Sequence, residues 1–232
     1  MPKFDLEKTA QLQQLFETPR GQREDAWIQR FYATVPDATL MSFTPQVQMG
    51  PDQFPYFQMS IPAPGPVTPF CVTHVLDSAL DNGFGMAIFG DPSRANGPEW
   101  VFTYGDLLSY SLYGRFDGNP EDVHEGAASQ AEAHQVLQAA PSESYLPVRA
   151  RRALGRYMTN TFRHPAPKVT LIVDPRLRPA RNLMLNLTLE QYHGDQNKLS
   201  AAMRYLSWFI PRTYGLVPMP AGWSDSKFVA LE

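Results

Sequence analysis

The sequence predicts an α+β protein with two units, each an antiparallel sheet that helices cover on one side. Short strand patterns with period-two alternation follow one another through turn residues, which is typical of antiparallel pairing. Amphipathic helical patterns separate these strand pairs, and a similar α-β-β-α order occurs twice. No glycine-rich turn of the phosphate-binding kind joins a strand to a helix. We therefore expect no cofactor.

The composition is that of an ordinary soluble globular protein. Of the 232 residues, 43% are hydrophobic and 19% are charged, which is enough to bury a core in one large or two small domains. The net charge of −3 argues against general affinity for nucleic acid. A single cysteine, Cys71, excludes an internal disulfide and a thiolate-rich zinc site. No apolar run suits a signal core or a membrane span, so we expect a cytoplasmic protein.

Two helices and two strands are expected at the start of the chain. A weak helical pattern covers 5–16, and a clearer one covers 23–34, where apolar side chains share one face (Trp27, Ile28, Phe31 and Val35). Strands are expected at 39–43 and 54–61. The second should lie at a sheet edge, because Pro55 cannot donate a backbone hydrogen bond.

A helix, a hairpin and a second helix are expected next. Thr68 and Pro69 suit an N-cap and a first helical residue. A buried stripe follows at helical offsets (Val72, Val75, Leu76, Ala79 and Leu80). Strands at 84–89 and 100–104 come after it, joined by a surface turn rich in Gly, Pro, Asp and Asn. Asp106 is expected to cap the second helix.

The composition then changes sharply. From 116 to 148 there are six acidic residues and no lysine or arginine. This run predicts an acidic linker at 117–146, between an N-terminal α+β unit at 1–116 and a C-terminal α+β unit at 147–232.

The C-terminal unit repeats the order helix, hairpin, helix. Its clearest helix is expected at 148–163, from the spacing of its apolar residues. Strands follow at 168–174 and 182–189, the latter with leucine at alternate positions. A last helix is expected to begin after Asp195 and to end before Pro211. The counterpart of this arrangement in the first unit is the helix at 69–82 with the hairpin after it.

Several runs in both units carry a resemblance to a known family. They are Leu146-Pro-Val148 opening a helix, the leucine-alternating strand, the helix before Pro211, the closing Leu216-Val-Pro218, and, earlier, the helix at 23–34 and Val101-Phe102-Thr103. Together they resemble SseB-like (enhanced serine sensitivity) proteins over most of the chain. The family is not defined by a catalytic residue set. The resemblance therefore implies a cytoplasmic accessory or interaction protein and transfers no catalytic residue.

One arrangement suits nucleophilic catalysis. Cys71 and His74 lie three residues apart on one expected helix, and Asp77 lies one turn further on. A thiolate–imidazole pair oriented by a carboxylate could serve a small hydrolase. However, the helical wheel places His74 and Asp77 on the solvent face, so an exposed polar surface with an incidental cysteine is the competing interpretation.

The other histidines give no metal site. His124, Glu125 and His134 lack the two-histidine spacing that a helical zinc motif needs. A solvated acidic linker accounts for them. His164 and His193 lie at the ends of expected elements, next to Pro165 and Gly194, where histidine commonly serves as a surface cap.

Basic residues are concentrated in the second unit. Between 149 and 181 there are nine lysines and arginines and one acid, a local charge of +8 against −11 for the rest of the chain. Four of the arginines form a stripe opposite the apolar face of the helix at 148–163: Arg149, Arg152, Arg156 and Arg163. Such a stripe suits plain solvation, an acidic protein partner, the chain's own acidic segment or nucleic acid.

From these features we expect a non-catalytic cytoplasmic accessory or adaptor protein that acts through protein–protein contacts. The arginine stripe is the expected site for a protein partner or for self-association. A small hydrolase and a nucleic-acid-binding protein are the alternatives.

Overall fold

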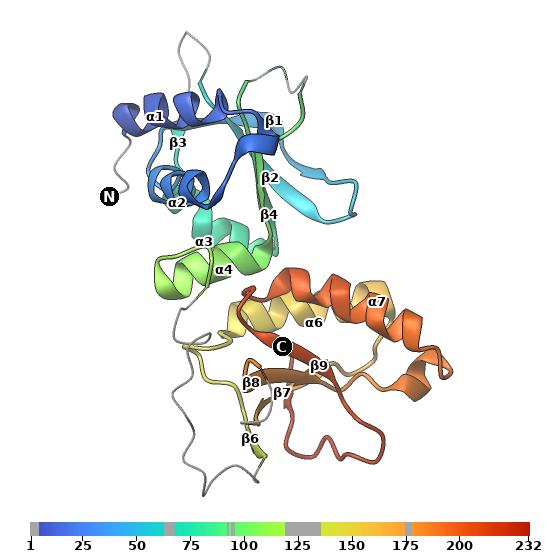
Figure 1. Ribbon diagram of the computed structural model, residues 1–232. Coiled ribbons are helices and arrows are strands. Elements are labelled where there is room, and N and C mark those ends of the chain that lie inside the picture. Colours follow the sequence, from blue (N-terminus) through green and yellow to red (C-terminus); the bar gives the residue numbers. More distant parts are fainter. Residues whose placement is uncertain (1–4, 63–67, 92, 94–95, 119–135, 175–177) are drawn as a thin grey trace, which may run out of the picture. The chain divides into compact units, whose positions relative to one another are not determined.

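The chain forms two compact units, Met1–Leu107 and Leu108–Glu232. The structure is a computed structural model that describes residues 5–62, 68–91, 93, 96–118, 136–174 and 178–232 (Figure 1). Each unit joins helices to a mixed sheet, which confirms the α+β class. Most of the expected linker at 117–146 lies outside the described residues.

The first unit holds a five-stranded sheet in the order β3-β1-β2-β4-β5. Its strands are β1 (Leu40–Met49), β2 (Pro55–Ser60), β3 (Pro69–Phe70), β4 (Gly85–Phe89) and β5 (Trp100–Phe102). Its helical elements are α1 (Leu6–Phe16), the 3₁₀ turn at Arg20–Gln22, α2 (Asp25–Thr34), α3 (Val72–Asn82) and the start of α4 (Tyr104–Tyr113). The helices lie on one side of this sheet (Figure 1).

The second unit holds a smaller sheet in the order β10-β7-β8-β9, with β6 also paired to β7. Its strands are β6 (Leu137–Ala139), β7 (Lys168–Val173), β8 (Arg181–Leu185), β9 (Gly215–Pro218) and β10 (Val229–Ala230). Its helical elements are α6 (Val148–Phe162), α7 (Gln196–Leu206) and the 3₁₀ turns at Leu189–Tyr192 and Ser207–Phe209. Among the described helices of both units, none combines the length and the apolar character needed to cross a bilayer.

The expectation of purely antiparallel sheets is wrong in both units. β1 and β2 form an antiparallel hairpin, but β2 and β4 run parallel. β7 and β8 likewise form a hairpin, and β8 and β9 run parallel. In both cases a helix connects the parallel strands, and such a crossover returns the chain to the end where the first strand began.

A repeated order is present, but different elements form it. The matching series are α2-β1-β2-α3-β4 in the first unit and α6-β7-β8-α7-β9 in the second. The counterpart of the β7–β8 hairpin is therefore the β1–β2 hairpin and not the predicted hairpin at 84–104. β5 is an addition at the edge of the first sheet.

Two local expectations for the first unit are also wrong. β2 lies between β1 and β4 rather than at an edge. Pro55 is tolerated there because it is the first residue of the strand. Thr68 and Pro69 do not begin α3, since Pro69 pairs with Met41 of β1 in a short strand. The N-cap of α3 is Cys71, whose backbone is extended.

The core of the first unit is a stack of aromatic rings between α2 and the sheet. Trp27 stacks on Phe31 with centroids 5.2 Å apart, and Phe31 stacks on Phe102 of β5 at 5.8 Å. Trp100 packs against both α2 rings, at 5.7 and 5.0 Å. The period-two alternation that predicted β5 thus sends Trp100 and Phe102 to the helix-covered face.

α4 begins with a reciprocal capping arrangement. The backbone N–H of Thr103 donates to the Asp106 carboxylate at 2.9 Å, and the N–H of Asp106 donates to the Thr103 hydroxyl at 3.1 Å. Thr103 is therefore the cap, and Asp106 occupies the third helical position instead of the expected N-cap. Asp195 caps α7 as expected and accepts from the N–H groups of Asn197 and Lys198.

Candidate functional site

The predicted arginine stripe lies on α6. The apolar side of this helix is buried through residues such as Leu154 and Met158, neither of which is exposed to solvent. Arg152 and Arg156 are exposed on the opposite side, as the wheel predicts. Arg163 is exposed as well, but it follows the helix as a left-handed C-cap with φ of 56°.

The fourth residue of the stripe is held by the second unit itself. Arg149 is half-buried, and its guanidinium donates to the hydroxyl of Ser111 at 2.8 Å. Its neighbour Arg151 forms an ion pair with Glu143 from the expected acidic linker. Internal pairing with that segment therefore involves Arg151, which lies outside the predicted stripe. Arg152, Arg156 and Arg163 remain as an exposed arginine surface.

The arrangement proposed for nucleophilic catalysis is divided between core and surface. The Cys71 side chain has no solvent exposure, and its sulfur lies 3.1 Å from the Thr73 hydroxyl. His74 and Asp77 are exposed, and the His74 ring stacks on Phe70. A substrate in solution can therefore contact the imidazole of His74 but not the sulfur of Cys71.

The histidine that follows α6 is not the surface cap that was expected. His164 is only 7% exposed, and its Nε2 lies 3.2 Å from the backbone oxygen of Asn186. The N–H of Ala166 donates to its Nδ1 at 3.3 Å. His193 does lie on the surface, as the C-cap of the turn Leu189–Tyr192.

The described parts of the chain contain no group of three metal-ligating side chains. His124, Glu125 and His134 lie outside the described residues.

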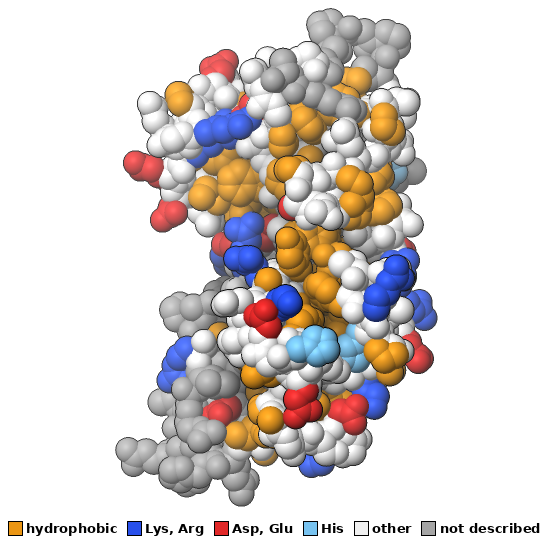
Figure 2. Space-filling model, turned by 90° about the vertical axis from the view of Figure 1, so that its right-hand side faces the viewer, with side chains coloured by type: hydrophobic (Ala, Val, Ile, Leu, Met, Phe, Trp, Pro, Cys, Tyr) orange, Lys and Arg blue, Asp and Glu red, His pale blue; other side chains and the backbone are white. Residues whose placement is uncertain are grey.

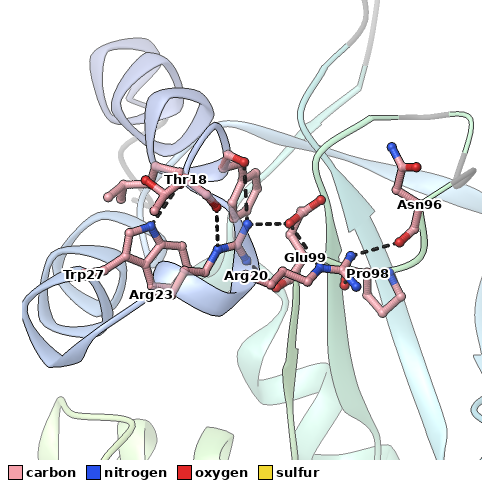
Figure 3. A network of polar contacts seen from close by, with 9 residues as sticks. Thr18, Arg20, Arg23, Trp27, Asn96, Pro98 and Glu99 are labelled. Atoms are coloured by element: carbon pink, nitrogen blue, oxygen red, sulfur yellow. Dashed lines mark hydrogen bonds and ion pairs between the residues drawn. The ribbon is translucent and has the colours of Figure 1, made fainter.

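Two arginines of another segment, Arg20 and Arg23, stabilise the first unit (Figure 3). Arg23 donates to the Glu99 carboxylate at 2.6 Å and to the Glu99 backbone oxygen at 3.0 Å. Its guanidinium also lies 4.5 Å from the ring centroid of Trp27. Arg20 donates to the backbone oxygens of Asn96 and Pro98. These arginines hold the segment that leads into β5 against the connection between α1 and α2.

The first unit also carries a cleft that the sequence did not predict, with a volume of about 530 Å³. It lies over β2, β4 and β5 on the sheet face opposite the aromatic stack. Its floor includes the cross-strand neighbours Gln58, Ala87 and Val101. Figure 2 looks onto the side of this unit that carries the β1–β2 hairpin, where hydrophobic side chains gather.

Small residues in β4 make this floor hollow. Along β4, Met86 and Ile88 fill the helix-covered face, whereas Gly85 and Ala87 point to the other face. A Cβ added at Gly85 would lie 2.6 Å from the backbone oxygen of Phe102 and 2.7 Å from the ring of Tyr56, so only glycine lets this ring approach β4 so closely. The alternation of small and large residues at 85–88 is the signal in the sequence that could have revealed the cleft.

Comparison with family models, with curated proteins and with solved structures gives no match to this chain.

Proposed function

We propose that the protein is a non-catalytic accessory or adaptor protein that binds an acidic surface of a protein partner through the arginine surface. The exposure of Arg152 and Arg156 along a helix whose opposite side is buried, with Arg163 exposed at its C-cap, supports this proposal most directly. Guanidinium groups suit carboxylates because their fixed planar donors match two oxygens at once.

The remaining basic residues of the helix support the choice of these three. Arg149 and Arg151 already have partners within the second unit, Ser111 and Glu143. They help to hold α6 in place, whereas Arg152, Arg156 and Arg163 are exposed to solvent. A second copy of the chain is included among the partners, because the expected segment at 117–146 is itself acidic.

A charge-reversal variant tests the proposal. We expect Arg152→Glu/Arg156→Glu/Arg163→Glu to lose binding to a decaglutamate peptide, which the wild type should bind with an affinity that falls as salt rises. The control reverses two other exposed arginines, Arg30→Glu/Arg204→Glu. Circular dichroism and thermal unfolding should show the same fold in all three proteins.

The same experiment separates the alternatives. A short DNA duplex of matched charge should bind more weakly than the peptide; tighter binding with a steep salt dependence would favour a nucleic-acid-binding protein. Equal peptide binding by the wild type and the triple variant would refute the arginine surface as the site. Rapid iodoacetamide labelling of Cys71 in the folded protein would revive the hydrolase alternative, because buried thiols react slowly.

A further inference from the structure

The cleft of the first unit has the dimensions and lining of a small-molecule site. Its volume of about 530 Å³ falls in the range of roughly 300–1,000 Å³ that is typical of ligand pockets. Its apolar walls come from the β1–β2 hairpin, from the floor strands and from the segment before β5. They include Met49, Pro51, Ala87, Phe89, Pro98 and Val101.

A single charged side chain is found among the described residues that line this cleft. Asp52, in the connection between β1 and β2, is exposed, and no described lysine or arginine lines the cleft with it. The Tyr56 hydroxyl donates to one of its oxygens at 2.5 Å, and the N–H of Phe54 donates to the other at 3.2 Å. These two bonds orient the carboxylate and leave further lone pairs on both oxygens.

The floor of the cleft adds a second acceptor. Gln58 is 7% exposed, and its Oε1 has no hydrogen-bond partner among the described residues. A buried polar atom without a partner is costly, and a ligand that donates a hydrogen bond relieves that cost. The Asp52 carboxylate and the Gln58 oxygen thus favour a ligand that donates hydrogen bonds, and Asp52 favours a positive charge.

We propose that this cleft binds a small aromatic amine, with the aromatic body on the apolar floor and the protonated amine paired to Asp52. An ammonium group supplies three hydrogen-bond donors and a positive charge that complements the negative carboxylate. The flat body suits the floor at Ala87, where β4 carries only a methyl group. This proposal concerns the first unit and does not depend on the arginine surface.

Three probes with the same indole ring test the charge preference: tryptamine, the neutral tryptophol and the anionic indole-3-acetate. Titration into ¹⁵N-labelled protein should shift amide signals of residues that line the cleft. We expect tryptamine to bind about two- to fivefold more tightly than tryptophol, as one exposed ion pair allows. Indole-3-acetate should bind most weakly.

Two variants connect the preference to the cleft. Asp52→Asn should abolish the advantage of tryptamine over tryptophol, whereas the control Asp77→Asn, an equal charge change on α3, should retain it. Ala87→Leu should fill the floor and weaken all three probes. Equal affinities for the three probes, shifts outside the cleft, or an undiminished preference in Asp52→Asn would each overturn the proposal, and Asp52→Asn decides the matter if Ala87→Leu does not fold.

Discussion

Arg23 places a guanidinium nitrogen 2.6 Å from a carboxylate oxygen of Glu99, 76 residues later in the chain. The side chains are only 6% and 15% exposed. The guanidinium also donates to the backbone oxygens of Thr18 and Glu99. This pair therefore joins the α1–α2 connection to the residue that leads into β5 (Figure 3).

Removing one partner of this pair should destabilise the protein. In Glu99→Ala the Arg23 charge stays buried without its counter-ion, and we expect the free energy of unfolding to fall by about 2–3 kcal/mol. Urea unfolding followed by tryptophan fluorescence measures this. Arg20→Ala is the matched control; its side chain is 56% exposed, so its loss should cost less than about 1 kcal/mol. Equal losses in both variants would contradict the structural role of Arg23.

A close approach between β8 and β9 makes a second prediction. A Cβ added at Gly215 would lie 1.7 Å from the side-chain oxygen of Asn182, its partner in the parallel ladder. We expect Gly215→Ala to lower the free energy of unfolding by about 1–3 kcal/mol, the usual cost of overpacking. Gly215→Ala/Asn182→Ala should recover part of that loss. A loss of stability in the double variant that equals or exceeds the sum of the two single losses would refute this explanation.

Much of the fold was predictable because local patterns dominate it. The buried stripe of α3, the alternation in β5 and the Asp195 cap each depend on residues within one or two turns. The sheet arrangement was less accessible, since pairing of β2 with β4 depends on a crossover and not on either strand's own pattern. Pro55 illustrates the difference, because the edge position it favours was overridden by its place at the strand start.

The candidate sites divide in the same way. The exposure of Arg152 and Arg156 follows from helix periodicity alone. The hydrogen bond from Arg149 to Ser111 joins residues 38 positions apart, and no local pattern reveals it. The buried position of His164 depends on Asn186, 22 residues later, and the cleft depends on strands that meet only in the folded sheet.

The half-buried Arg149 and the exposed Arg152 of α6 should contribute differently to the free energy of unfolding. Arg149→Ala removes a hydrogen bond to Ser111 from a half-buried group, and we expect a loss of about 1 kcal/mol in the free energy of unfolding. Arg152→Ala should change it by less than about 0.5 kcal/mol, because the residue is exposed. Chemical denaturation of the two variants under identical conditions tests this, and the reverse order would contradict the assignment of Arg152 to binding.

The cap of α7 should make the stability of the second unit depend on pH. The backbone N–H of Lys198 lowers the pKa of Asp195, with smaller contributions from the Lys198 charge and the N–H of Asn197. A lowered pKa in the folded state means that the stabilisation is complete above the unfolded value of about 3.9. The advantage of the wild type over Asp195→Ala should therefore be constant near neutral pH and disappear as the pH falls through the lowered pKa.

Asparagine provides the control for this cap, because it caps helices about as well as aspartate but does not titrate. Asp195→Asn should keep an advantage over Asp195→Ala at every pH, whereas the wild type should lose its advantage in acid. Urea midpoints of the three proteins from pH 7 to pH 2 follow these differences, and an NMR titration of Asp195 gives the pKa directly. A wild-type advantage that stays constant into strong acid would show that the hydrogen bonds to the side-chain oxygen, and not the carboxylate charge, stabilise this helix end.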